Sequence, residues 1–163
     1  MRLHVLRSCR VIVGISVALC SWINPAVAQS AKDPLVGTWV LDRGKSDFVP
    51  DNATLQKRIM IFKVVENGLN CVIKTENTRG EVVESSYTAK YDGKDAPIDV
   101  SILDTVSLKR VEANTYERTG KIKGKAVETA TMKVSPDGKK LTVTTSGSVE
   151  GTDYSSTQVF DRQ

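Results

Sequence analysis

The chain has very little histidine, cysteine and tryptophan. Its 163 residues include one His, three Cys and two Trp, and His4, Cys9, Cys20 and Trp22 all lie in the first 28 residues. If that segment is cleaved as a signal peptide, no His remains. Acid–base catalysis by His, Ser–His or Cys–His pairs and His-ligated metals are then excluded. The remaining Cys71 has no second Cys with which to form an intrachain disulfide.

The first 28 residues have the parts of a secretory signal peptide. The first ten residues carry three Arg and no acid, residues 11–23 are mostly apolar, and Ala26-Val27-Ala28 is an Ala-x-Ala cleavage site. The apolar run is shorter than the ~20 residues of a membrane span, which disfavours an uncleaved anchor. Leu19 stands where a small residue would precede a lipid-modified Cys20, which disfavours a lipoprotein. We expect a signal helix and an exported protein, periplasmic or secreted.

Cleavage would also remove most of the excess positive charge. The whole chain has 23 basic and 19 acidic residues and a formal charge of +4, but three of the Arg belong to the signal segment. Composition therefore gives no argument for nucleic acid or an anionic membrane as a partner. Taking 28 from 163 residues leaves 135, which suits one domain of about 100–150 residues.

From residue 35 onward the sequence alternates between strand and turn patterns, with no amphipathic helix. In the run 35–42, alternation puts Gly37, Trp39 and Leu41 on one face. Residues 42–48 break the alternation and predict a turn or a single helical turn, with Phe48 folding back as a lid. Later turn signals recur about every ten residues, for example Asn67-Gly68, Asp92-Gly93 and Ser135-Pro136-Asp137-Gly138.

These consecutive hairpins predict an all-β fold, an up-and-down antiparallel β-barrel of 8–10 strands. A long meander closes on itself because open edges would invite aggregation. A β-sandwich is the alternative, but evenly spaced strands with tight sequential turns favour barrel closure over Greek-key crossings.

Gly37-Thr38-Trp39 on the first strand resembles the Gly-x-Trp signature of lipocalins and fatty-acid-binding proteins, the calycin group. The wider pattern resembles small secreted bacterial lipocalin-like proteins over nearly all of the chain after residue 28. Its parts are the run 37–42, Lys45-Ser46-Asp47-Phe48, Tyr91-Asp92-Gly93-Lys94, Leu108-Lys109-Arg110 and Ser135-Pro136-Asp137-Gly138-Lys139. The expected organisation is a signal peptide at 1–28, a flexible start at 29–34 and a lipocalin-like β-barrel domain at 35–163.

The resemblance implies that Gly37, Trp39 and Arg162 form a structural plug. In that group the first-strand Trp packs across the closed end of the barrel, often under an Arg or Lys from the last strand, where a stacked guanidinium stabilises by about 0.5–2 kcal/mol. Gly37 leaves room for backbone or indole to approach closely. Trp39 should then be buried, touch the last strand and lie outside any pocket mouth. The alternative for Arg162 is fraying at the terminus.

The last strand departs from the pattern of intracellular fatty-acid-binding proteins. Those proteins carry an Arg-x-Tyr that grips the ligand carboxylate, and the matching stretch here is Gln158-Val159-Phe160. Their helical lid is also missing, because too few residues separate the first two strands. The departure argues against fatty-acid binding of that particular kind.

Two Arg on one predicted hairpin are candidates for a polar centre. Arg110 shares a face with Leu108, and Arg118 shares a face with Tyr116. If they point inward, they need a carboxylate from a ligand or from Glu128. If the strand register slips by one residue, they point to solvent. The ligand-lining candidates are Tyr87, Tyr91, Tyr116, Arg110 and Arg118.

The remaining chemistry in the sequence is sparse. Cys71 alternates with apolar residues and is expected in the core rather than as a reactive thiol. Zinc spacings, calcium loops and Gly-rich phosphate cradles are absent. We expect no cofactor and no metal, and no enzyme, because neither His nor paired acids are available for catalysis.

The residues and the resemblance together predict an exported lipocalin-like barrel that binds a small, largely apolar ligand. Its expected partner is a small hydrophobic or amphipathic molecule, with no nucleic acid and no stable membrane span after cleavage. The alternative is a cell-envelope protein-interaction or inhibitor module with a filled barrel and a protein partner. Large side chains filling the interior would favour this second hypothesis.

Overall fold

A computed structural model describes residues 33–66 and 68–163. The expected signal peptide at 1–28 and most of the expected flexible start lie outside the described residues. The ten strands are β1 (Gly37–Val49), β2 (Leu55–Val65), β3 (Gly68–Asn77), β4 (Val82–Ala89), β5 (Asp92–Asp99), β6 (Thr105–Glu112), β7 (Thr115–Ile122), β8 (Lys125–Val134), β9 (Lys140–Val149) and β10 (Thr152–Arg162).

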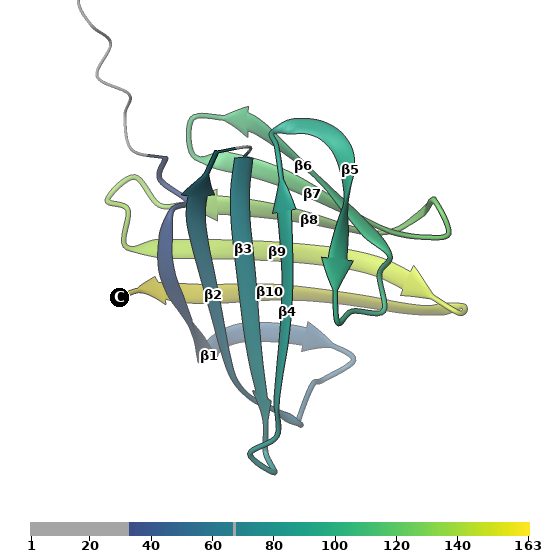
Figure 1. Cartoon of the computed structure of the whole chain (residues 1–163). Helices are drawn as coiled ribbons and strands as arrows, with labels where there is room; N and C mark the ends of the chain where they lie inside the picture. Colours follow the sequence, from purple (N-terminus) through teal and green to yellow (C-terminus); the bar gives the residue numbers. More distant parts are fainter. Residues whose placement is uncertain (1–32, 67) are drawn as a thin grey trace, which may run out of the picture. The chain divides into compact units, whose positions relative to one another are not determined.

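The strands form one closed barrel in sequence order. Each strand pairs antiparallel with its neighbours, and β10 returns to pair with β1. In Figure 1, β2, β3 and β4 run nearly vertically in front, and β8, β9 and β10 run across behind them. The all-β class and the up-and-down closure are confirmed, and the sandwich alternative is excluded. Among the described residues there is no helix of the length and hydropathy needed to cross a membrane.

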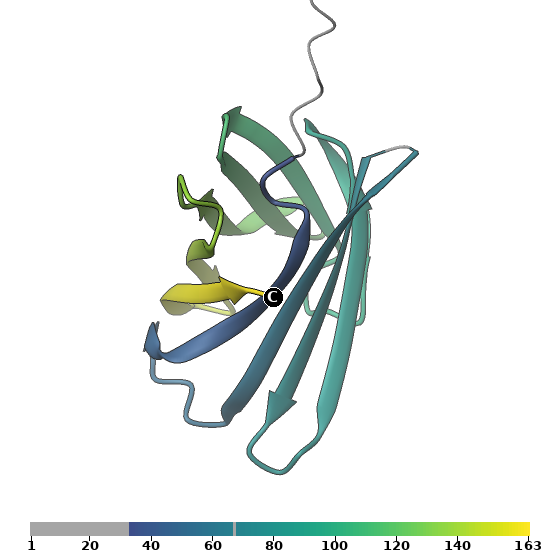
Figure 2. The ribbon, with the colours of Figure 1, turned by 90° about the vertical axis from the view of Figure 1, so that its left-hand side faces the viewer.

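The connections between the strands lie at the two opposite ends of the barrel. The β1–β2 loop and the β3–β4 hairpin project from the same end, as Figure 2 shows. The β5–β6, β7–β8 and β9–β10 connections belong to this end as well, because the strands alternate in direction. We call it the open end. Trp39, near the start of β1, and Arg162, at the end of β10, belong to the opposite, closed end.

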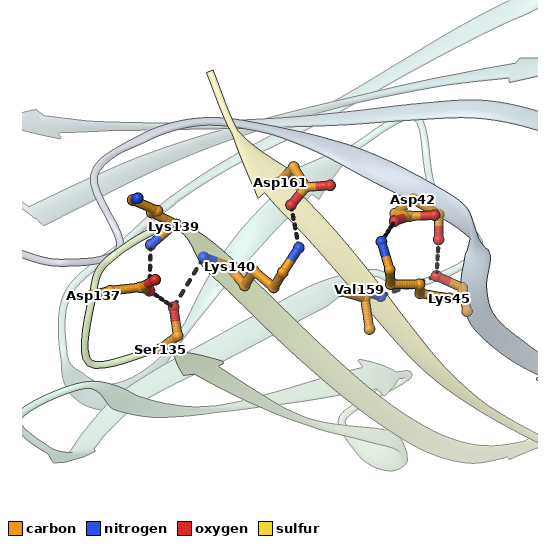
Figure 3. Close-up of polar contacts among 9 residues, drawn as sticks. Asp42, Lys45, Ser135, Asp137, Lys139, Lys140, Val159 and Asp161 are labelled. Atoms are coloured by element: carbon orange, nitrogen blue, oxygen red, sulfur yellow. Dashed lines mark hydrogen bonds and ion pairs between the residues drawn. The ribbon is translucent and has the colours of Figure 1, made fainter.

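The predicted turn at 42–48 is instead a bulge inside β1. Asp42 pairs with Val159 of β10 and Asp47 pairs with Thr157, so four residues of β1 face one residue of β10. The buried Ser46 side chain bridges the gap: its hydroxyl donates to the Asp42 carbonyl at 2.7 Å and accepts from the Val159 N–H at 3.0 Å. Figure 3 shows Asp42, Lys45 and Val159 at this bulge. A side chain replaces the missing ladder contacts, so the strand continues to Val49.

Trp39 is fully buried at the closed end, and the Arg162 guanidinium lies 4.1 Å from the centroid of its ring. The indole N–H donates to the Leu35 carbonyl at 2.9 Å. Arg162 donates to the carbonyls of Pro34, Val36 and Gly138, and a Cβ on Gly37 would lie only 2.4 Å from its Nη1. The space left by Gly37 is therefore taken by the guanidinium, and the end of the chain is tied to its first strand.

The core fills the closed half of the barrel. The largest fully buried side chains are Trp39, Tyr116, Phe62, Phe160, Leu69, Leu108, Met132 and Leu141. Each belongs to the inward-facing set of its strand, because alternate residues of a strand point to opposite faces. Burial of apolar area of this kind, at about 25 cal/mol per Å2, is the main stabilising contribution in a barrel without a disulfide.

Candidate ligand-binding site

A cavity of about 580 Å3 occupies the barrel toward its open end. Trp39 does not line this cavity. The apolar lining comes from six strands and two connections: Phe48, Val49, Pro50, Met60, Ile73, Ile98, Ile102, Leu103, Met132 and Val143. The volume lies within the ~300–1,000 Å3 that is usual for small-molecule sites. The barrel interior is therefore not filled by its own side chains.

The cavity lies where β1 and β2 separate. These strands pair only from Gly37 to Val40, and Val40 faces Ile59 at the last pair. Beyond it, β1 follows β10 and β2 follows β3, and residues 48–52 between them line the cavity. Phe48 is held there by Arg43, whose guanidinium lies 4.7 Å from the ring centroid. Phe48 thus contributes to the cavity wall from the end of β1.

An ion pair lies on the opposite wall of the cavity. Arg118 of β7 pairs with Glu128 of β8, and both side chains are only 14% exposed. The Tyr154 hydroxyl of β10 donates to the other oxygen of Glu128 at 2.8 Å. Tyr154 fits because Gly147 has no side chain: a Cβ there would lie 2.6 Å from the phenol oxygen. Both carboxylate oxygens are thus satisfied within the protein.

Burial and charge act in opposite directions on this pair. Burial lowers the pKa of Arg118 and is the largest single influence on it. The Glu128 carboxylate, together with smaller contributions from Tyr87, Cys71 and Tyr154, outweighs burial, so the pKa lies above its usual value. Burial, followed by the Glu128 carboxylate, raises the pKa of Tyr154. Arg118 is therefore charged and its charge is matched.

A second Arg, Arg58 of β2, also lines the cavity. Its Nε donates to the Thr75 hydroxyl at 3.2 Å, and its Nη1 donates to the Gln158 side-chain carbonyl at 2.7 Å. Gln158 is buried and its amide donates to the Ser156 hydroxyl at 3.0 Å. Burial, followed by the like charge of Arg118, lowers the pKa of Arg58. The partners of this guanidinium are neutral.

The structure separates the five ligand-lining candidates. Arg118 lines the cavity, whereas Tyr87 is buried outside the cavity lining. Tyr91 and Tyr116 point inward at the closed end, where both hydroxyls donate to Asp33 and their ring centroids are 5.5 Å apart. Arg110 is exposed.

Tyr87, Tyr91, Tyr116 and Arg110 were expected to line the cavity, and none of these four side chains does. Tyr91 lies in the β4–β5 connection and Tyr116 is the second residue of β7, so both lie at the level of the plug and not at the level of the cavity. Arg110 covers the Tyr116 ring from outside, 5.5 Å from its centroid, and donates to the Glu112 and Ala113 carbonyls. Burial, followed by hydrogen bonding to Asp33, raises the pKa of Tyr91 and Tyr116. This group holds the segment before β1 against the barrel.

Asp33 and Pro34 belonged to the expected flexible start, yet both make specific contacts. Asp33 accepts the two tyrosine hydroxyls and the Leu35 N–H at 3.0 Å, and the Pro34 carbonyl accepts from Arg162. The ordered domain therefore includes residue 33.

Sequence reasoning missed Arg58, Tyr154 and Gln158. A signal for Arg58 was present, because it alternates with Met60 and Phe62 and so belongs to an apolar face. The signal for Tyr154 and Gln158 was the inward position of Arg162, from which every second residue back along β10 also faces inward.

Cys71 is fully buried in the core. Burial raises the pKa of its thiol to about 12, so the reactive thiolate is scarce near neutral pH. The described residues hold no group of three or more His, Cys, Asp or Glu that could bind a metal ion.

Fold and cavity together define the class: a closed antiparallel barrel with an internal pocket. No protein-family model and no curated protein matches the chain. Among solved structures, zebrafish ileal bile acid-binding protein complexed with cholic acid is similar, with 12% identity and a TM-score of 0.48 over 80% of this chain and 99% of that one. The siderocalin Ex-FABP has 9% identity and a TM-score of 0.40 over 80% of this chain and 74% of that one. At these levels the ligands of those proteins do not carry over.

Proposed function

We propose that the protein is an exported, lipocalin-like barrel that binds a small, largely apolar ligand in its interior, and that it is not an enzyme. The observation that carries the proposal is the cavity of about 580 Å3, whose lining combines ten apolar side chains with polar and charged ones. Burial of apolar ligand surface at about 25 cal/mol per Å2 would supply affinity, and the polar groups would orient the ligand. Export is proposed from residues 1–28 alone.

The alternative is a protein-interaction or inhibitor module of the cell envelope. Its support is the apolar rim of the open end, where Val49, Val100 and Ile102 are 63%, 68% and 69% exposed. Exposed apolar groups close together often mark an interaction surface. The unfilled interior favours the carrier, because a module that acts through its rim gains nothing from an internal cavity.

The test is native mass spectrometry of the full chain expressed in, and purified from, its native host, followed by organic extraction. We expect a reproducible small-molecule adduct, and a polypeptide mass that lacks residues 1–28. A clean apo mass together with a stoichiometric protein partner would support the module instead. A retained signal segment would contradict export by cleavage.

A pair of Trp substitutions makes the test specific for the cavity. Ile73→Trp places a large ring in the cavity, since Ile73 lines it, whereas Val64→Trp places the same ring near the end of β2, where Val64 is 69% exposed. We expect the adduct to be lost from the first variant and kept in the second. An adduct that survives Ile73→Trp would mean that the ligand binds elsewhere.

A further inference from the structure

We propose that the ligand of this cavity carries a single negative charge on an oxyacid group, a carboxylate or its equivalent, and that Arg58 receives it. The inference rests on the proposed function and deepens it, because it names the ligand class and the residue that selects it. Three independent observations support it: the charge balance of the cavity, the geometry of the guanidinium, and the surroundings of Arg58.

One of the charged groups that line the cavity, Arg58, has no ion-pair partner in the described part of the chain. Arg118 is matched by Glu128, and Asp51 at the mouth is paired with Arg43 at 3.2 Å. Within residues 33–66 and 68–163, no carboxylate lies within ion-pair distance of Arg58. A half-buried cation without a counter-charge is costly. A ligand with one negative charge would supply the missing partner.

The guanidinium of Arg58 is oriented but not saturated. Of its five N–H groups, the structure pairs the one on Nε with Thr75 and one on Nη1 with Gln158. The amide of Gln158 is itself fixed by its bond to Ser156. Three N–H groups remain, including both on Nη2, and these can donate to the oxygens of a carboxylate.

The surroundings of Arg58 fit a molecule with one polar end. Arg58 lies one residue beyond the last β1–β2 pair, Val40 with Ile59, and it lines the same cavity as Met60, Ile73 and Met132. Methionine side chains adapt to apolar bodies of different shape. A charged head on Arg58 would leave the apolar part of the ligand against these side chains. The ligand class is therefore a monoanionic amphiphile.

The first experiment uses the wild-type protein and three probes that differ only in their head group: decanoate, 1-decanol and decylammonium. Affinities are measured by titration calorimetry at neutral pH. A hydrogen bond to a charged group corresponds to roughly 10- to 100-fold in affinity, so we expect decanoate to bind that much more tightly than 1-decanol. Decylammonium should bind most weakly, because the charged group of the cavity that lacks an ion-pair partner among the described residues, Arg58, is itself a cation. Acidification should reduce the preference for decanoate as the probe itself becomes protonated.

The second experiment assigns the preference to Arg58. Arg58→Gln should bring decanoate down to the affinity of 1-decanol and change 1-decanol by less than about threefold, whereas Arg58→Lys should keep part of the preference because the charge remains. Arg79→Gln is the matched control: it removes the same charge at the β3–β4 hairpin, where Arg79 is 77% exposed and pairs with Glu81. It should change neither affinity.

The outcomes separate this inference from the proposed function. If 1-decanol binds as tightly as decanoate, or if the extracted natural ligand is neutral or cationic, the inference is overturned and the carrier remains. If Arg58→Gln weakens both probes equally, Arg58 only supports the cavity wall, and the inference is also overturned. If neither a probe nor a natural adduct binds, both proposals fail. Should Arg58→Gln not fold, the wild-type preference and Arg58→Lys decide.

Discussion

The two ends of this barrel use the same strands in different ways. At the closed end, Trp39 and Phe160 are fully buried, and the charged groups Asp33 and Arg162 are paired within the protein: Asp33 accepts two tyrosine hydroxyls, and Arg162 donates to three carbonyls. Toward the open end the inward side chains surround a cavity, and the Arg58 cation lacks a carboxylate partner among the described residues. The capacity to bind comes from leaving part of one continuous core unfilled.

Strand β10 contributes both to the cavity and to the buried closed end. Its inward residues, read from the open to the closed end, are Tyr154, Ser156, Gln158, Phe160 and Arg162. The first three line the cavity, and the last two belong to the buried end. The change from cavity to core takes place between Gln158 and Phe160, opposite the bulge in β1. A stable closed end and a binding open end can therefore be altered separately.

The largest effect is expected from Trp39→Ala. Removal of a fully buried Trp leaves a void and takes away the surface on which Arg162 stacks, so the free energy of unfolding should fall by about 3–5 kcal/mol. The measurement is urea denaturation at neutral pH. Val64→Ala, near the end of β2 where the side chain is 69% exposed, is the control and should cost less than about 0.5 kcal/mol. A loss below about 1.5 kcal/mol for Trp39→Ala would show that the closed end is not the stable part.

A smaller effect is expected from Glu128→Gln in the cavity wall. It leaves Arg118 without its carboxylate, and breaking a buried ion pair costs about 3–5 kcal/mol. The expected loss here is about 2–3 kcal/mol, because the pair borders a cavity that solvent can enter. Glu81→Gln removes an exposed partner of Arg79 and should have no measurable effect.

Glu128→Gln should also change the affinity of the cavity for an anionic ligand. With Glu128 replaced, two unmatched guanidinium groups line the cavity, so decanoate should bind more tightly than it binds the wild type. A stability loss no larger than that of Glu81→Gln, or a weaker affinity for decanoate, would mean that the Arg118–Glu128 pair contributes nothing to the open end.

The fold could be predicted because its signals are local. Strand alternation and turn residues lie within a few positions of each other, and the sequential hairpins left closure as the best arrangement. The bulge in β1 was missed because it depends on a distant partner: the Ser46 hydroxyl accepts from Val159, which is 113 residues away. Nothing near residue 46 in the sequence indicates that contact.

The candidate site was less predictable, because alternation gives the face of a residue but not its level along the barrel. Tyr116 and Arg118 are two residues apart on one inward face, yet Tyr116 reaches Asp33 at the closed end and Arg118 reaches Glu128 in the cavity wall. The level follows from pairing across strands that are far apart in sequence. The role of Arg58 was harder still to predict from the sequence. What distinguishes Arg58 is that its partners on the neighbouring strands are neutral and none of them is a carboxylate.

The smallest effect at neutral pH is expected from Tyr87→Phe. The Tyr87 hydroxyl is buried in the filled part of the barrel, opposite Cys71, and has no hydrogen-bond partner among the described residues. Loss of an unpaired buried hydroxyl should leave stability unchanged or raise it by up to about 1 kcal/mol. Tyr154→Phe is the control from the cavity side: its hydroxyl donates to Glu128, so its loss should destabilise by about 1 kcal/mol.

Alkaline pH enlarges the contrast between Tyr87→Phe and the wild type. Burial raises the pKa of Tyr87 well above its usual value in the folded protein, whereas in the unfolded chain Tyr ionises near pH 10. The stability associated with this group is therefore complete below about pH 10 and is lost as the pH rises further, by up to about 1.4 kcal/mol per pH unit. The variant is spared that loss, so the difference in unfolding free energy between the two proteins should grow from pH 10 upward. If Tyr87→Phe instead destabilises the protein at pH 7 by more than about 1 kcal/mol, the Tyr87 hydroxyl has a hydrogen-bond partner. The polar groups in the filled half of the barrel would then be more completely hydrogen-bonded than the contacts indicate.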